Sequence, residues 1–175
     1  IANTDGNRKV KAKAIELLSY TEDNRYMPLF QKYINDSSYS IAGAALLGLN
    51  TLDPENALTR SRKFISDAKD KLAEVAGSTL MEKGTEEDFD FVEKSYANMP
   101  SSQQKFNATA SFCVYLGKIN DTQKLKQGID DIIDFRAGIS DTNRAITDSV
   151  ITVFFTQLGK LKGAEIADYI KNVFQ

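Results

Sequence analysis

Acidic clusters are the groups of residues in this sequence that come nearest to a chemical site. Asp130, Asp131 and Asp134 are close together, and the first and last share one face of a predicted helix, as two ligands of a hard cation would. A second cluster, at the start of another predicted helix, comprises Glu86, Glu87, Asp88 and Asp90. The positive end of the helix dipole favours acidic residues there, and such side chains normally lie in water. We therefore interpret both clusters as solvated surface rather than as metal or acid/base sites.

The residues that most often perform catalysis or bind zinc are nearly missing. Histidine is absent, and Cys113 is the single cysteine. This composition excludes histidine-based general bases and the HExxH and Cys/His classes of zinc site. Cys113 lies in an apolar stretch without a cationic neighbour, which predicts a buried structural thiol rather than a nucleophile. We expect no catalytic residue, metal ligand or cofactor site in this chain, which by itself is not an enzyme.

Basic residues occur in two arrangements. A cluster at Arg60, Arg62 and Lys63 fits a solvated helix face better than a phosphate site, because the net charge is −2. The second arrangement is a column related by the repeat described below and comprises Lys9, Ser40, Lys71 and Lys105. Such columns line one face of a repeat protein, so these four are candidate lining residues of a concave face. The alternative is that they are solvent positions beside the helix starts.

Length and composition limit the class of protein. The 175 residues are 42% hydrophobic and 26% charged, as in an ordinary globular domain. The charge lacks the basic excess of nucleic-acid binders, and the longest apolar run, residues 41–49, is too short to span a membrane. We expect a soluble protein with neither nucleic acid nor membrane as a partner. Because the first residue is Ile1 rather than Met, we interpret residues 1–175 as a single domain excised from a longer chain.

An internal repeat organises the sequence. Four columns recur every 31 residues through the first half, and after spacings of 34 and then 40 residues the pattern continues twice more. The columns are Asp5, Asp36, Asp67, Ser101 and Asp141; Val10, Ile41, Leu72, Phe106 and Ile146; Ala14, Ala45, Ala76, Ala110 and Val150; and Leu18, Leu49, Leu80, Val114 and Phe154. Each Asp or Ser is placed to cap a helix, the apolar residues four apart share one helix face, and the small residue lets a neighbouring helix approach closely.

Five further helices are predicted between these repeats, at about residues 24–35, 54–66, 86–98, 122–135 and 164–174. Pro28 and Pro54 fit first helical turns, and Asp121 is placed to cap a helix. The predicted fold is all-α: five antiparallel helix pairs stacked as a right-handed α-α superhelix, a HEAT/armadillo-like solenoid. The alternative is an irregular globular bundle.

The segment from Asp36 to Leu49, DSSYSIAGAALLGL, resembles the second helix of a HEAT repeat, although Ala42 replaces the basic residue that commonly follows the aliphatic one. With the opening KVKAKAIELL from Lys9 to Leu18, it makes the whole chain similar to the C-terminal helical-repeat domain of bacterial zinc aminopeptidases of the aminopeptidase N type. In that family a preceding thermolysin-like domain holds zinc through HExxH and a downstream Glu. None of those motifs exists here, so no catalytic residue is carried over.

The resemblance implies a non-catalytic domain that caps the active-site chamber and restricts peptide access. Its partners would be the upstream catalytic domain, which carries the zinc, and the peptide substrates, in the bacterial cytoplasm or periplasm. Two alternatives stay open. One is a free-standing HEAT-type scaffold that binds another protein. The other is an enzyme on the same fold, similar to the helical-repeat DNA alkyl-glycosylases, against which the absence of Trp and the negative charge argue.

Overall fold

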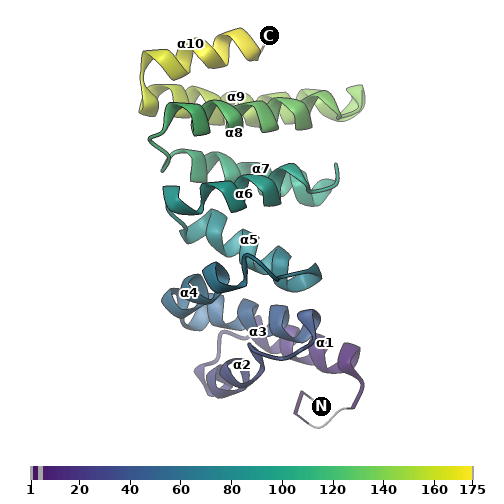
Figure 1. Ribbon diagram of the computed structural model, residues 1–175. Helices are drawn as coiled ribbons and strands as arrows, with labels where there is room; N and C mark the ends of the chain where they lie inside the picture. Colours follow the sequence, from purple (N-terminus) through teal and green to yellow (C-terminus); the bar gives the residue numbers. More distant parts are fainter. Residues whose placement is uncertain (1, 4–5, 175) are drawn as a thin grey trace. The chain divides into compact units, whose positions relative to one another are not determined.

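The structure is a computed structural model that describes residues 2–3 and 6–174 (Figure 1). Within these residues the chain forms ten α-helices and two short 3-10 helices, and no strand. The all-helical prediction is confirmed. No helix in the described part is long and apolar enough to cross a membrane. The chain divides into two compact units, Ile1–Lys83 and Gly84–Gln175, and each is described by itself.

The first unit is built around one central helix. α3 packs against α1, α2, α4 and α5, and it is the most apolar helix of the unit. The elements of the unit are α1 (Arg8–Ser19), η1 (Asn24–Tyr26), α2 (Met27–Tyr33), α3 (Tyr39–Leu52), α4 (Pro54–Phe64) and α5 (Asp70–Lys83). Pro28 and Pro54 lie in the first turns of α2 and α4, as predicted. Because α1, α3 and α5 pack in succession, the 31-residue repeat of the sequence corresponds to a repeat of helix positions.

Small residues let the neighbours of α3 approach closely. A Cβ atom on Gly48 would lie 2.5 Å from the ring of Phe30 on α2, and one on Gly43 would lie 2.7 Å from the backbone of Lys71 on α5. Ala45 and Ala76, in the predicted small-residue column, are fully buried. The burial of these two residues agrees with the predicted role of that column in close helix packing, whereas Ala14, its first member, is only partly buried.

The second unit contains α6 to α10. Its elements are η2 (Glu86–Asp88), α6 (Phe89–Ala97), α7 (Gln103–Leu116), α8 (Thr122–Ala137), α9 (Asp141–Lys162) and α10 (Ala164–Val173). The ring of Tyr96 stacks on that of Phe112 at a centroid distance of 4.3 Å, and the two rings join α6 to α7. The hydroxyl of Tyr96 is 2.8 Å from Thr109 Oγ1, so the buried phenol has a polar partner. Asp121 accepts the backbone N–H groups of Gln123 and Lys124 and caps α8, as predicted.

The capping role predicted for the Asp/Ser column is wrong where the structure describes it. Asn7 caps α1 and Ser102, rather than Ser101, caps α7, because the chain enters each helix one or more residues later than expected. Asp36 accepts the N–H of Ser38, the residue that precedes α3, and Asp67 lies three residues before α5 begins. Asp5 and the side chain of Asp141 lie outside the described residues.

The apolar columns are in the wrong register in the second unit. Val114 and Ile146, expected on the packed face, are 61% and 64% exposed. Positions one residue away from the columns are buried instead: one residue earlier on α7, at Thr109 and Cys113, and one residue later on α9, at Thr147, Ile151 and Phe155. One residue turns a helix by about 100°. The aromatic stack of α6 on α7 and the longer spacings between these repeats set a helix rotation that the 31-residue pattern does not contain.

We predict that Ala45→Leu destabilises the protein by about 1–3 kcal/mol, because the fully buried site has no room for three more carbons. Thr51→Leu on the same helix is the matched control; it lies in solvent and should change the free energy of unfolding by less than about 0.5 kcal/mol. Denaturant unfolding measures both. Equal stabilities of the two variants would contradict the packing of α3.

Candidate functional site

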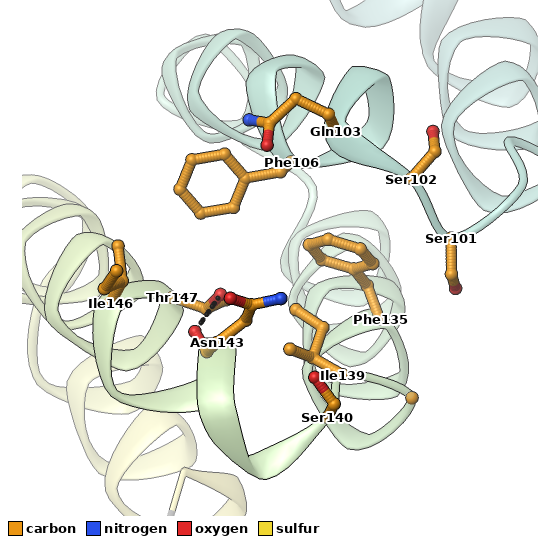
Figure 2. A pocket seen from close by; sticks show the side chains of 11 residues that line it. Ser101, Ser102, Gln103, Phe106, Phe135, Ile139, Ser140, Asn143, Ile146 and Thr147 are labelled. Carbon is orange, nitrogen blue, oxygen red and sulfur yellow. Dashed lines mark hydrogen bonds between the residues drawn. The ribbon is translucent and has the colours of Figure 1, made fainter.

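A groove in the second unit is the best-formed candidate binding site. It lies where the start of α7, the end of α8 and the start of α9 meet, and its volume is about 450 Å³. Figure 2 shows Phe106, Phe135 and Asn143 directed toward the hollow from different helices. The apolar lining consists of Phe106, Phe135, Ile139 and Ile146. The polar side chains around it are Ser101, Ser102, Gln103, Ser140, Asn143 and Thr147.

Local sequence explains why these side chains meet. Ser102 Oγ accepts the N–H of Lys105 and starts α7, so that Phe106 lies in its first turns. At the other side of the groove α8 ends at Ala137, and the N–H of the capping residue Gly138 reaches the last carbonyls of the helix; α9 begins three residues after Gly138. This short connection holds Ile139 between the two helices. The groove is therefore fixed by two helix starts and one helix end.

The chemistry of the groove suits binding rather than catalysis. None of the residues that line it is ionisable near neutral pH, so the lining offers no side chain suited to act as a general acid or base there. Its apolar floor and its hydroxyl and amide rim match the pattern of sites that bind an apolar side chain together with a hydrogen-bonding backbone. Across the described residues, no group of three His, Cys, Asp or Glu side chains is placed to hold a metal ion.

A buried lysine lies behind the groove. Lys105 is only 6% exposed, and its ammonium donates a hydrogen bond to the backbone carbonyl of Ala97 at 2.9 Å. The same ammonium lies 4.9 Å from the ring centroid of Tyr96 and 5.7 Å from that of Phe135, which lines the groove. Burial lowers the pKa of Lys105. The cation therefore helps to fix Phe135 through a cation–π contact.

Asp131 on α8 is the acidic group most affected by this environment. Its Oδ2 atom is buried without a hydrogen-bond partner. Burial, followed by the nearby carboxylates of Glu93 and Asp134, raises the pKa of Asp131 to about 6, although Lys105 acts in the opposite direction. Sequence reasoning placed Asp131 in a solvated cluster and missed this partial burial. The two neighbours of Asp131 in the sequence differ: Asp130 is exposed and Ile132 is fully buried. Asp131 therefore lies at the edge of the buried face of α8, which a run of acidic residues does not indicate.

The other acidic cluster is structural rather than merely solvated. The Glu86 carboxylate accepts the N–H groups of Asn120 and Asp121 at 3.1 and 2.8 Å, and these two bonds lower the pKa of Glu86. Asp88 is buried and accepts the N–H of Thr85 in a capping box. The cluster therefore ties the start of α6 to the connection before α8.

The four candidate lining residues fall in both units. Lys9 and Ser40 are exposed on α1 and α3, and Lys71 is partly buried on α5 and forms an ion pair with Glu74 at 3.2 Å. These three occupy equivalent positions on helices that pack in succession. Lys105 belongs to the second unit and is buried there. The lining of one concave face by all four stays a prediction. Cys113 is buried, as predicted, and burial raises the pKa of its thiol to about 12.

We predict that Asp131 makes the protein more stable at pH 5 than at pH 8, by about 1 kcal/mol once solvent screening of the half-buried group is allowed for. A carboxyl whose folded-state pKa is raised destabilises the fold when it is ionised, and that penalty falls as the pH drops through about 6. Histidine, the side chain whose ordinary pKa lies between pH 5 and 8, is absent from the chain. Denaturant unfolding at the two pH values measures the difference.

Asp131→Asn should abolish this pH dependence and stabilise the protein at pH 8. Asp168→Asn is the control, since Asp168 is exposed on α10 and its charge is not one of those that shift the pKa of Asp131. A pH dependence that survives in Asp131→Asn would show that a different carboxyl is responsible.

No protein-family model, curated protein sequence or solved structure matches this chain. The function proposed below therefore depends on the geometry of the groove, on the repeat packing of the first unit, and on the resemblance of the segment Asp36–Leu49 to a HEAT repeat.

Proposed function

We propose that this chain is a non-catalytic helical-repeat domain that caps the active-site chamber of a zinc aminopeptidase and restricts the peptides that enter it. The proposal includes a HEAT-like α-α superhelix as the arrangement of the helix pairs. The observation that carries it is the repeat packing of the first unit. There the HEAT-like segment Asp36–Leu49 contains most of α3, the helix on which the four neighbouring α-helices pack.

The described packing supports a repeat protein over an irregular bundle. In the first unit, helices at a fixed sequence spacing contact one another in succession, and the same column positions, at Ala45 and Ala76, are fully buried in consecutive repeats. Repeat proteins of this kind act through extended surfaces rather than through an internal catalytic cavity. A wall or lid for a chamber formed by another domain is a role that such a surface can fill.

The groove of the second unit supports contact with peptides. Its neutral, apolar lining and polar rim fit a peptide side chain and backbone, and its lack of ionisable lining groups fits binding without cleavage. In this proposal the zinc and its ligands belong to the upstream catalytic domain, and this chain supplies only part of the surface that substrates meet.

A free-standing protein-binding scaffold is the second candidate, and exposed apolar residues favour it. Val114, Ile146 and Val153 are each more than half exposed on α7 and α9. Such residues on one pair of helices could equally contact another folded protein. The two candidates differ in whether the groove affects peptide turnover in the natural protein.

We predict that Ile146→Asp in the natural full-length protein lowers kcat/KM for peptides about 3–10-fold and leaves hydrolysis of a single-residue aminoacyl reporter unchanged. The reason is that a charge in the apolar lining weakens peptide contacts by about 1 kcal/mol, while the reporter is too short to reach them. Leu161→Asp is the matched control, because Leu161 is equally exposed on the same helix and lies outside the groove lining.

The parent gene provides the complementary test. The aminopeptidase proposal expects an upstream region that encodes HExxH on a predicted helix and a second zinc-binding Glu downstream of it. An upstream region without these motifs would contradict the proposal and favour the scaffold. Equal effects of Ile146→Asp on peptides and on the aminoacyl reporter would contradict the role of the groove in peptide access.

A further inference from the structure

One face of α1 is apolar and only partly covered. We call it the α1 outer face; it consists of Val10, Ala14, Leu17 and Leu18. Leu17 is 57% exposed and Val10 is 42% exposed, whereas the opposite face of α1, with Ala12 and Ile15, is buried in the core of the first unit. A helix with apolar residues on both sides normally has packing partners on both sides.

The 31-residue repeat shows which positions in the following repeats correspond to this face. The equivalents of Val10, Ala14, Leu17 and Leu18 are Ile41, Ala45, Gly48 and Leu49 on α3, and Leu72, Ala76, Thr79 and Leu80 on α5. All eight equivalents are buried. The first copy is less covered, although its residues are as apolar as those of the later copies: Val10 and Leu17 are exposed, and Ala14 and Leu18 are only partly buried. The difference therefore lies in what covers the face, not in the face itself.

Two helices cover each later copy. On α3, the helix α2 packs against this face, with the Phe30 ring against Gly48. Helix α1 packs on α3 as well. On α5, the corresponding partners are α4 and α3. Ser61 on α4, the equivalent of Phe30, is fully buried as well. Each repeat helix is thus paired with the helix that directly precedes it in the sequence, and among the described residues α1 has no such partner.

The space for that partner is present in the structure. A groove of about 780 Å³ runs along the α1 outer face and is lined by apolar residues of α1 (Ala14, Leu17 and Leu18) and of the next helix pair (Tyr26 and Leu29), and also by Asn3, Arg25 and Lys32. An apolar strip with polar side chains beside it suits a docked amphipathic helix. The size of the groove matches a row of side chains rather than a single one.

The residues at the start of the chain lie where the missing partner would end. Ala2 is 9% exposed and belongs to the core of the first unit, and Asn3 Oδ1 accepts hydrogen bonds from Lys32 Nζ and from the Tyr33 hydroxyl, both at 3.2 Å. The repeat places Ala2 and Asn3 in register with Tyr33 and Ile34, where α2 ends. A helix that ended at Ala2 would therefore pack against α1 in the same way as α2 packs against α3.

We propose that an amphipathic helix of the polypeptide that precedes Ile1 docks in this groove, pairs with α1 and covers Leu17 with an apolar side chain. The helix completes the first pair of the stack. This interaction is independent of the proposed peptidase role, because a scaffold built from the same repeat needs the same cover.

The test compares Leu17→Cys with Tyr20→Cys in the natural protein. Tyr20 is 64% exposed, lies outside the groove, and corresponds to exposed Thr51 in the next repeat, so it is the matched control. We expect a thiol reagent to modify the cysteine at position 17 about tenfold more slowly than the one at position 20, because modification requires the docked helix to open. The native Cys113 is buried and contributes little background. Equal rates at the two positions would overturn the proposal.

A diazirine analogue of leucine at position 17 identifies the occupant. We expect intramolecular crosslinks to the residues just before Ile1, within about 12 residues, or three helical turns. Crosslinks to a second copy of the chain, or to a distant part of the same chain, would overturn the proposal. Neither outcome bears on the peptidase assay of Ile146→Asp, so the two proposals fail separately.

Discussion

The close contact between α3 and its neighbours is the constraint on which the first unit depends. Two of the four helices that pack on α3 approach it closely because two positions on α3 lack side chains: Phe30 of α2 fills the space at Gly48, and the backbone of α5 fills the space at Gly43. Dense contacts of this kind supply the dispersion energy of a core, and they disappear if the helices move apart by even a fraction of an ångström.

The sequence predicted the fold of the first unit well and that of the second unit only in part. In the first unit the period is constant, so Ile41, Ala45 and Leu49 could be aligned with their equivalents in the next repeat, and all are buried. In the second unit the spacing changes, and polar or charged residues such as Lys105 and Thr109 occupy core positions. A periodicity argument counts only apolar residues, so it predicted a buried face on α7 and α9 that is displaced by one residue from the observed one. Helix boundaries were predicted within a few residues, but the capping residues depend on local backbone geometry.

At the candidate site, the sequence indicated which kinds of residue are present, but not the environment in which the folded chain places them. The absence of histidine already argued against a catalytic site, and the groove of the second unit has the neutral lining of a binding surface. No pattern in the sequence indicated that Lys105 is buried against two aromatic rings or that Asp131 lies partly buried near it. Those environments are created by α6, α7 and α8 together, and residues from separate helices meet only in the folded unit.

A double-mutant cycle between Gly48 and Phe30 tests the packing constraint most directly. Alanine is favoured over glycine inside a helix by about 1 kcal/mol, so Gly48→Ala would stabilise α3 if nothing lay against it. With the Phe30 ring 2.5 Å from the new methyl group, we expect Gly48→Ala to destabilise the protein by about 1–3 kcal/mol. In a Phe30→Leu background the same substitution should cost at least about 1 kcal/mol less. Stabilisation by Gly48→Ala, equal in both backgrounds, would contradict the close approach of α2 to α3.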